Sequence, residues 1–221
     1  MKAFVILCTL CSLFAYLNAE TITFFDGDFV DGDYTSISQG TGVVNASTDN
    51  SGGNPGSFRR ISLTVDPFET ARGIELLNSA VFNPQLQGEV QSVSVSFDVA
   101  RVFNSVPGAT QISRGIAVEQ DGNVFLLINS PPATNTSFQN FSVNDIVPLL
   151  GGVNWVDGPE ITFGFFNQVS TSQTGFTIDG GYDNFEVNVT FNPIPEPSTY
   201  IVLLFGFVFF GLINTTKRKH S

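Results

Sequence analysis

The chain has 221 residues, a formal net charge of −11 and only two cysteines. Residues 20–197 hold all 20 acidic residues and five arginines but no lysine, histidine or cysteine, so this body carries about −15 charges. An acidic surface of this kind repels nucleic acid, and a nucleic-acid partner is therefore excluded. Without cysteine the body has no disulfide framework, so a packed hydrophobic core must hold it together.

The N-terminus has the pattern of a secretory signal peptide. Met1 and Lys2 form a short positive segment, and the stretch from Ala3 to Phe14 is apolar. Ala19 is a suitable residue before a cleavage site. We therefore expect residues 1–19 to be a signal peptide and the exported protein to begin at Glu20.

Residues 20–192 show the pattern of an all-β domain. Short alternating or β-branched runs are separated by Gly, Asn, Asp and Pro, and no stretch keeps a period of 3.6 residues. The runs that we expect to be strands are Thr21–Phe25, Ser57–Val65, Val93–Phe103, Gly115–Glu119, Val124–Asn129, Ser137–Val143, Ile161–Phe166, Gly175–Ile178 and Phe185–Phe191. Nine to eleven strands in one unit predict a single antiparallel β-sandwich.

Two turn and loop signals complete this prediction. Asp121-Gly122 lies between two strand runs and is the strongest hairpin signal in the chain. The polar, glycine-rich segment from Asn45 to Gly56 is expected to be a mobile loop.

Missing residue types exclude most enzyme chemistries. Without His, Cys or Lys in the body there is no ordinary base for a nucleophilic triad, no Schiff base and no nitrogen or sulfur ligand for zinc. A pair of carboxylates acting on a glycosidic bond is the remaining option, but no spacing singles out a pair. We therefore predict that the protein is not an enzyme and assign no catalytic residue.

The acidic residues near the N-terminus of the body raise a calcium hypothesis. Asp26 and Asp28 begin a cluster of four aspartates within residues 26–33, and Asp183 could complete a site if the first and last strands pair. The body is similar to jelly-roll modules of the carbohydrate-binding type, in which an acidic residue before the last strand binds structural calcium. The alternative, which we favour, is that the Asp-Gly pairs form turns.

Trp155 is the only tryptophan, and it lies in a glycine-rich stretch. A tryptophan in a loop can stack on a sugar, with Tyr34 or Tyr182 beside it. A single tryptophan also commonly fills the edge of a sandwich, and this second interpretation is the one that we favour.

The last 27 residues contain three parts in a fixed order. Pro195, Glu196 and Pro197 form a stiff tripeptide that excludes helix. An uncharged apolar run follows from Tyr200 to Ile213, and with its uncharged flanks it reaches about 28 Å as a helix, close to the hydrocarbon thickness of a bilayer. The basic residues that end the tail and are expected to stay cytoplasmic are Lys217, Arg218 and Lys219.

This combination resembles the PEP-CTERM sorting signal of bacterial surface proteins. The resemblance covers residues 193–221 and implies processing near the Pro-Glu-Pro motif by a membrane-embedded exosortase. It also implies export, transient anchoring in the inner membrane with the body outside the cytoplasm, and then a place at the cell surface or in the extracellular matrix.

The sequence leaves three functions open, and we expect the first of them. The first is a structural or adhesive protein associated with extracellular polysaccharide. The second is a carbohydrate-binding module, and the third is a glycosidase that uses a carboxylate pair. No cofactor other than possible calcium is predicted.

Overall fold

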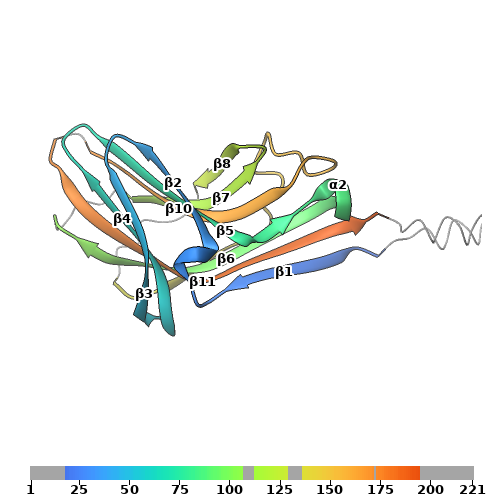
Figure 1. Cartoon of the computed structure of the whole chain (residues 1–221), viewed down its shortest axis with the longest axis horizontal. Helices are drawn as coiled ribbons and strands as arrows, with labels where there is room; N and C mark the ends of the chain where they lie inside the picture. Colours follow the sequence, from blue (N-terminus) through green and yellow to red (C-terminus); the bar gives the residue numbers. More distant parts are fainter. Residues whose placement is uncertain (1–17, 107–111, 129–135, 172, 195–221) are drawn as a thin grey trace, which may run out of the picture.

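The computed structural model describes residues 18–106, 112–128, 136–171 and 173–194. These residues form two antiparallel sheets packed face to face, which confirms the predicted all-β sandwich (Figure 1). The strands of the six-stranded sheet are β1 (Glu20–Asp26), β3 (Val43–Gly53), β4 (Gly56–Val65), β6 (Gly88–Asn104), β9 (Gln139–Val143) and β11 (Phe176–Pro193). Those of the five-stranded sheet are β2 (Tyr34–Gly40), β5 (Thr70–Phe82), β7 (Ile112–Gln120), β8 (Asn123–Ile128) and β10 (Ile161–Ser170).

The chain passes repeatedly between the two sheets. The six-stranded sheet has the order β3-β4-β11-β6-β9, and the five-stranded sheet has the order β2-β5-β10-β7-β8. Consecutive strands from β4 to β11 alternate between the sheets, apart from the β7–β8 hairpin. In the described ranges, two short helices connect strands: η1 (Asp31–Asp33) and α2 (Pro84–Gln87).

The long last strand organises the six-stranded sheet. On one side β11 pairs with β6 along its length. On the other side its first half pairs with β4 and its second half with β1. The first and last strands therefore pair, with Glu20 opposite Phe191, and both described ends of the chain lie at one end of the sandwich beside α2 (Figure 1).

Aromatic rings fill the space between the sheets. Phe165 on β10 stacks on Tyr182 of β11 with ring centroids 4.3 Å apart, and Phe97 and Phe185 pack around this pair. All four side chains have no solvent exposure. This aromatic centre supplies the core that a body without disulfides requires.

A buried ion pair also joins the two sheets. Arg59 on β4 donates hydrogen bonds to Glu75 on β5, with an Nη2–Oε2 distance of 2.7 Å, and both side chains are almost fully buried. Arg59 also pairs with Asp31 and lies 5.0 Å from the ring of Tyr34. Burial raises the pKa of Glu75, although the charge and hydrogen bonds of Arg59 oppose this change.

The structure corrects the sequence prediction in one segment and adds strands elsewhere. Asn45 to Gly56 is not a mobile loop, because most of it forms β3, which pairs with β4. Strands β2 and β5 had no counterpart in the prediction, and the two last predicted strands are one continuous strand, β11. The Asp121-Gly122 hairpin is confirmed, with positive φ values of 54° and 74° at its two central residues.

Candidate functional site

The outer face of the five-stranded sheet carries apolar side chains of its own. Along β10, Phe163 and Phe165 point into the main core, whereas Phe166 points to the opposite side. On this outer face Phe166 and Ile74 have no solvent exposure. The full apolar cluster consists of Ile74, Leu76, Ala117 and Phe166, with Ile37, Val124 and Leu126 partly buried against it.

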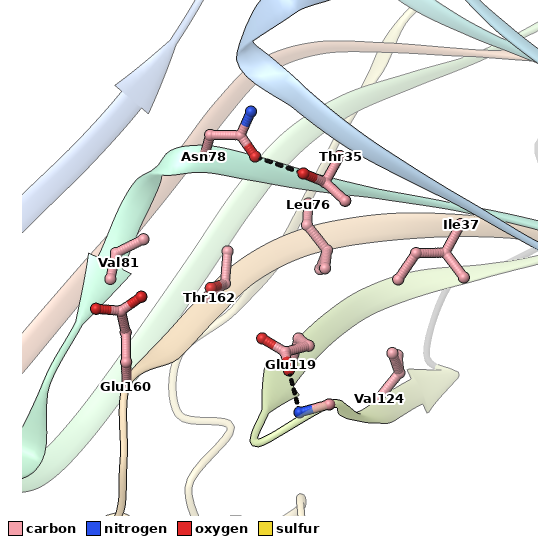
Figure 2. A pocket seen from close by; sticks show the side chains of 10 residues that line it. Thr35, Ile37, Leu76, Asn78, Val81, Glu119, Val124, Glu160 and Thr162 are labelled. Atoms are coloured by element: carbon pink, nitrogen blue, oxygen red, sulfur yellow. Dashed lines mark hydrogen bonds between the residues drawn. The ribbon is translucent and has the colours of Figure 1, made fainter.

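A hollow of about 360 Å³ lies at one end of this outer face. Figure 2 shows the side chains of β2, β5, β7 and β10 that surround it, together with residues of the β7–β8 hairpin. Apolar and polar groups both line the hollow. The lining residues are Thr35, Ile37, Leu76, Asn78, Val81, Glu119, Gly122, Val124, Glu160 and Thr162.

Internal hydrogen bonds orient some of these polar groups and leave others available. The Thr35 hydroxyl donates to the Asn78 side-chain oxygen at 2.7 Å, and the Gly122 amide donates to Glu119 Oε1 at 2.5 Å (Figure 2). The second carboxylate oxygen of Glu119 and the exposed carboxylate of Glu160 have no hydrogen-bond partner within the described ranges. The hollow therefore offers carboxylate acceptors, amide and hydroxyl groups, and aliphatic surface.

This mixture of groups suits a neutral ligand that is rich in hydroxyl groups. Carboxylates accept hydrogen bonds from hydroxyls, and the Asn78 amide can both accept and donate them, while Leu76 and Val124 offer apolar contact to C–H surfaces. Glu119 and Glu160 repel an anion at this end of the face. The ionisable side chains that line the hollow are Glu119 and Glu160, and the body has no His, Cys or Lys to act beside them.

A second hollow, of about 300 Å³, lies at the other end of the same face. Arg72 on β5 is flanked by Gln39 on β2 and Gln168 on β10, which are its register partners. Arg72 donates to Gln168 Oε1 through Nε at 2.7 Å and to Gln39 Oε1 through Nη1 at 2.7 Å. The two glutamines therefore fix the position of the guanidinium group.

The structure gives the predicted calcium ligands other roles. Asp26 accepts hydrogen bonds from the amides of Asp28 and Phe29 and from the Tyr34 hydroxyl, as expected of a turn. No cluster of three or more side chains of the usual metal-binding types is found in the part of the chain that the structure describes. Calcium binding stays a prediction.

Asp183 lies in the gap between β4 and β1 along β11. Its carboxylate accepts hydrogen bonds from the backbone amides of Asn54 and Asn184, and its side chain is fully buried. Burial raises the pKa of Asp183, and the charges of Asp98 and Asp26 raise it further. Asn184 also donates to Asp98 at 2.9 Å, so amides surround this pair of acids.

Trp155 is in the core and not on a binding surface. Its side chain is only 7% exposed, and its ring stacks on Phe163 with centroids 6.5 Å apart. Tyr34 and Tyr182 are also buried. The hypothesis that these rings stack on a sugar is therefore not supported by their positions, and Trp155 fills the sandwich edge as the alternative interpretation expects.

The predicted sorting residues lie outside the described residues. These are Pro195, Glu196 and Pro197, the apolar run 200–213, and the basic residues Lys217, Arg218 and Lys219. Most of the predicted signal peptide, residues 1–17, is also outside. Within the ranges that the structure describes, no helix is long and apolar enough to span a membrane.

Sequence reasoning missed the residues of the two hollows. Glu119 stands at the end of a predicted strand beside the Asp121-Gly122 turn, but nothing in the sequence joins it to Glu160. Arg72, Ile74 and Leu76 alternate along β5, which was a signal for one face of a strand. The alternation could not be recognised, because the intervening residues Gly73, Glu75 and Leu77 lie on a second buried face and are not uniformly polar.

The solved structures to which this chain is similar include several carbohydrate-binding modules. A family 11 carbohydrate-binding module from Clostridium thermocellum, in complex with a β-1,3-1,4-mixed-linked tetrasaccharide, is 14% identical, with a TM-score of 0.49, over 75% of this chain and 94% of that module. A family 30 module of a Clostridium thermocellum cellulase is 13% identical, with a TM-score of 0.47, over 74% and 96%. A family 29 module complexed with mannohexaose is 13% identical, with a TM-score of 0.40, over 77% and 92%.

These similarities are too distant to assign a ligand to this chain. No family model matches the sequence, and a search of curated proteins finds no match. The geometry of the outer face itself must therefore indicate the class of ligand.

Proposed function

We propose that this protein is a noncatalytic glycan-binding protein that works outside the cytoplasm, and that the outer face of the five-stranded sheet is its binding face. The hollow that holds Glu119, Glu160 and Thr162 carries this proposal. It combines hydrogen-bonding groups with aliphatic surface on a rigid sheet, which is what recognition of a polyhydroxyl chain requires. The ligand at this end is neutral, because two carboxylates line it.

Binding follows from two kinds of contact. Sugar hydroxyls donate to the carboxylates of Glu119 and Glu160 and exchange hydrogen bonds with Asn78, while C–H groups pack on Leu76 and Val124. A hydrogen bond to a charged group contributes about 1.5–3 kcal/mol, so the loss of one carboxylate weakens binding roughly 10- to 100-fold. A face that is held by strand pairing binds without a large rearrangement.

Affinity electrophoresis in native gels that contain soluble polysaccharides tests this proposal. A panel of neutral glucans, mannans and xylans should include one that retards the wild-type protein. Glu160→Gln should lower the apparent affinity for that polysaccharide at least tenfold and so reduce the retardation. The matched control is Glu89→Gln, because Glu89 is an exposed acid on β6 of the other sheet. Retardation by no member of the panel, or equal loss in both variants, would contradict the proposal.

A reducing-end assay with the retained polysaccharide separates binding from catalysis. Glu119 and Glu160 are two carboxylates in one hollow, which is the arrangement that a glycosidase uses. Incubation with the retained polysaccharide should release no new reducing ends over a day. Release that disappears in Glu160→Gln would replace the binding proposal with a glycosidase.

Delivery to the cell surface is a separate part of the proposal. It is supported by the order of the three sequence segments after residue 194, which resembles a PEP-CTERM signal. Replacing Pro195 and Glu196 with alanine should block processing and leave the full-length chain in the membrane. Mass spectrometry of surface and membrane fractions decides the matter, and an intact C-terminus through Ser221 in a host with an exosortase would contradict sorting.

A further inference from the structure

Arg72 differs from its neighbours in the pairing of its charge. Arg59 and Arg60 both form ion pairs with acidic residues. Arg72 and the fully buried Arg114 form none within the described ranges, and of these two only Arg72 lines a hollow on the outer face. Neutral glutamine oxygens hold it instead. An arginine without a counter-ion in such an acidic protein is a ready site for an external anion.

The position of the guanidinium group fits that role. Arg72, Gln39 and Gln168 line a hollow of about 300 Å³ on the outer face. The two glutamines take three of the five N–H donors, through Nε, Nη1 and Nη2. Two donors, one on each terminal nitrogen, have no partner among the described residues, and an arginine fork binds a carboxylate with such a pair.

The two hollows lie along one row of outward side chains. Thr162 of the first hollow and Gln168 of the second are six residues apart on β10, which is about 20 Å at the rise of a β-strand. Apolar side chains of the outer cluster, including Ile37 and Leu126, occupy the face between them. The face therefore has an acidic end and a cationic end, joined by apolar surface.

We propose that the Arg72 hollow binds the carboxylate of an acidic sugar or of an acidic sugar substituent. This inference rests on the proposed glycan-binding function and names the class of glycan: a mainly neutral chain that carries isolated carboxylates. The neutral part lies at the Glu119 end, and the carboxylate lies against Arg72. Dense polyanions are disfavoured, because the whole body is acidic.

Two cellulose derivatives with the same backbone test the proposal in native gels at physiological salt. Hydroxyethylcellulose is neutral, and lightly substituted carboxymethylcellulose carries isolated carboxylates. The wild-type full-length protein should bind the carboxymethyl polymer about tenfold more tightly, as a charge-assisted pair predicts. Arg72→Gln should abolish this preference by lowering the affinity for the carboxymethyl polymer about tenfold, whereas Arg72→Lys should keep part of the preference.

A charge-matched variant excludes a general effect of net charge. Arg60→Gln removes the same charge from β4, on the other sheet, and should keep the preference. Equal binding of the two polymers by the wild-type protein would overturn the inference, and so would a preference that survives Arg72→Gln. If neither cellulose derivative nor any polysaccharide of the neutral panel binds, the proposed function itself is overturned.

Discussion

Buried charge at single residues is the least conventional part of this core. Arg59 and Glu75 are 2% and 0% exposed, and they face each other between the sheets. A buried ion pair contributes little net stability, but the loss of one partner leaves an uncompensated charge. The pair therefore constrains how the two sheets align more than it strengthens the fold.

Replacement of Arg59 by methionine should destabilise the protein by about 3–5 kcal/mol at pH 7, because Glu75 is then charged and alone. Burial raises the pKa of Glu75, so this carboxyl takes up a proton more readily in the folded than in the unfolded chain. The contribution of protonated Glu75 to the free energy of unfolding is present at low pH and is lost as pH rises through the folded-state pKa. The destabilisation should accordingly be smaller at pH 4.5, as measured by urea unfolding.

The double variant Arg59→Met/Glu75→Gln is the control for this interpretation. It removes both charges and should recover most of the lost stability. If the single variant loses the same free energy at both pH values, or the double variant recovers none, Glu75 is not an unpaired buried charge in the absence of Arg59.

The Asp183 carboxylate gives a second prediction at this scale. If calcium binds between Asp26 and Asp183, millimolar Ca²⁺ stabilises only the native state and raises the melting temperature. Asp183→Asn should remove this increase. A melting temperature that does not respond to calcium in the wild-type protein leaves Asp26 as a turn residue and Asp183 as a buried acceptor of amide hydrogen bonds.

At the scale of elements, the binding face depends on how closely β5 and β10 approach. The register between them shifts at Gly164, where a Cβ atom would lie 2.0 Å from the carbonyl oxygen of Glu75. No side chain fits there without moving one strand, since the obstructing atom belongs to the backbone. Glycine at this position therefore allows β5 and β10 to approach closely where their register shifts.

Gly164→Ala should destabilise the sandwich by more than about 2 kcal/mol and weaken glycan binding as well. Gly151→Ala is the matched control, because a Cβ atom added at Gly151 would have nothing within 4 Å, and it should be near neutral in thermal unfolding. Equal stability of the two variants would show that β5 and β10 can separate without cost.

Strands that have one solvent-exposed face could be predicted from the sequence. The alternation in Val93 to Phe103 and in Phe185 to Phe191 marks β6 and β11, since one side of each is polar. β5 was missed because both of its faces are largely buried, and β3 because its sequence is mostly polar and is ordered by pairing with β4. The candidate site was missed for a related reason: register, which brings Glu119 and Glu160 together, is a long-range property.

At the scale of the whole molecule, the structure separates stability from recognition. The six-stranded sheet contains both described ends of the chain and pairs the first strand with the last. The five-stranded sheet presents two hollows and an apolar cluster on its outer side. The proposed binding face therefore lies on the sheet that contains neither described end of the chain.

Methyl NMR of the isotopically labelled full-length chain, titrated with oligosaccharides of the retained polysaccharide, tests the binding face most directly. The methyl groups of Ile37, Leu76 and Val124 line the first hollow and should shift in proportion to bound ligand. Those of Ile22 on β1 and Val93 on β6, in the other sheet, should not shift. Shifts confined to the six-stranded sheet, or none at saturating ligand, would contradict the proposal that the outer face of the five-stranded sheet binds glycan.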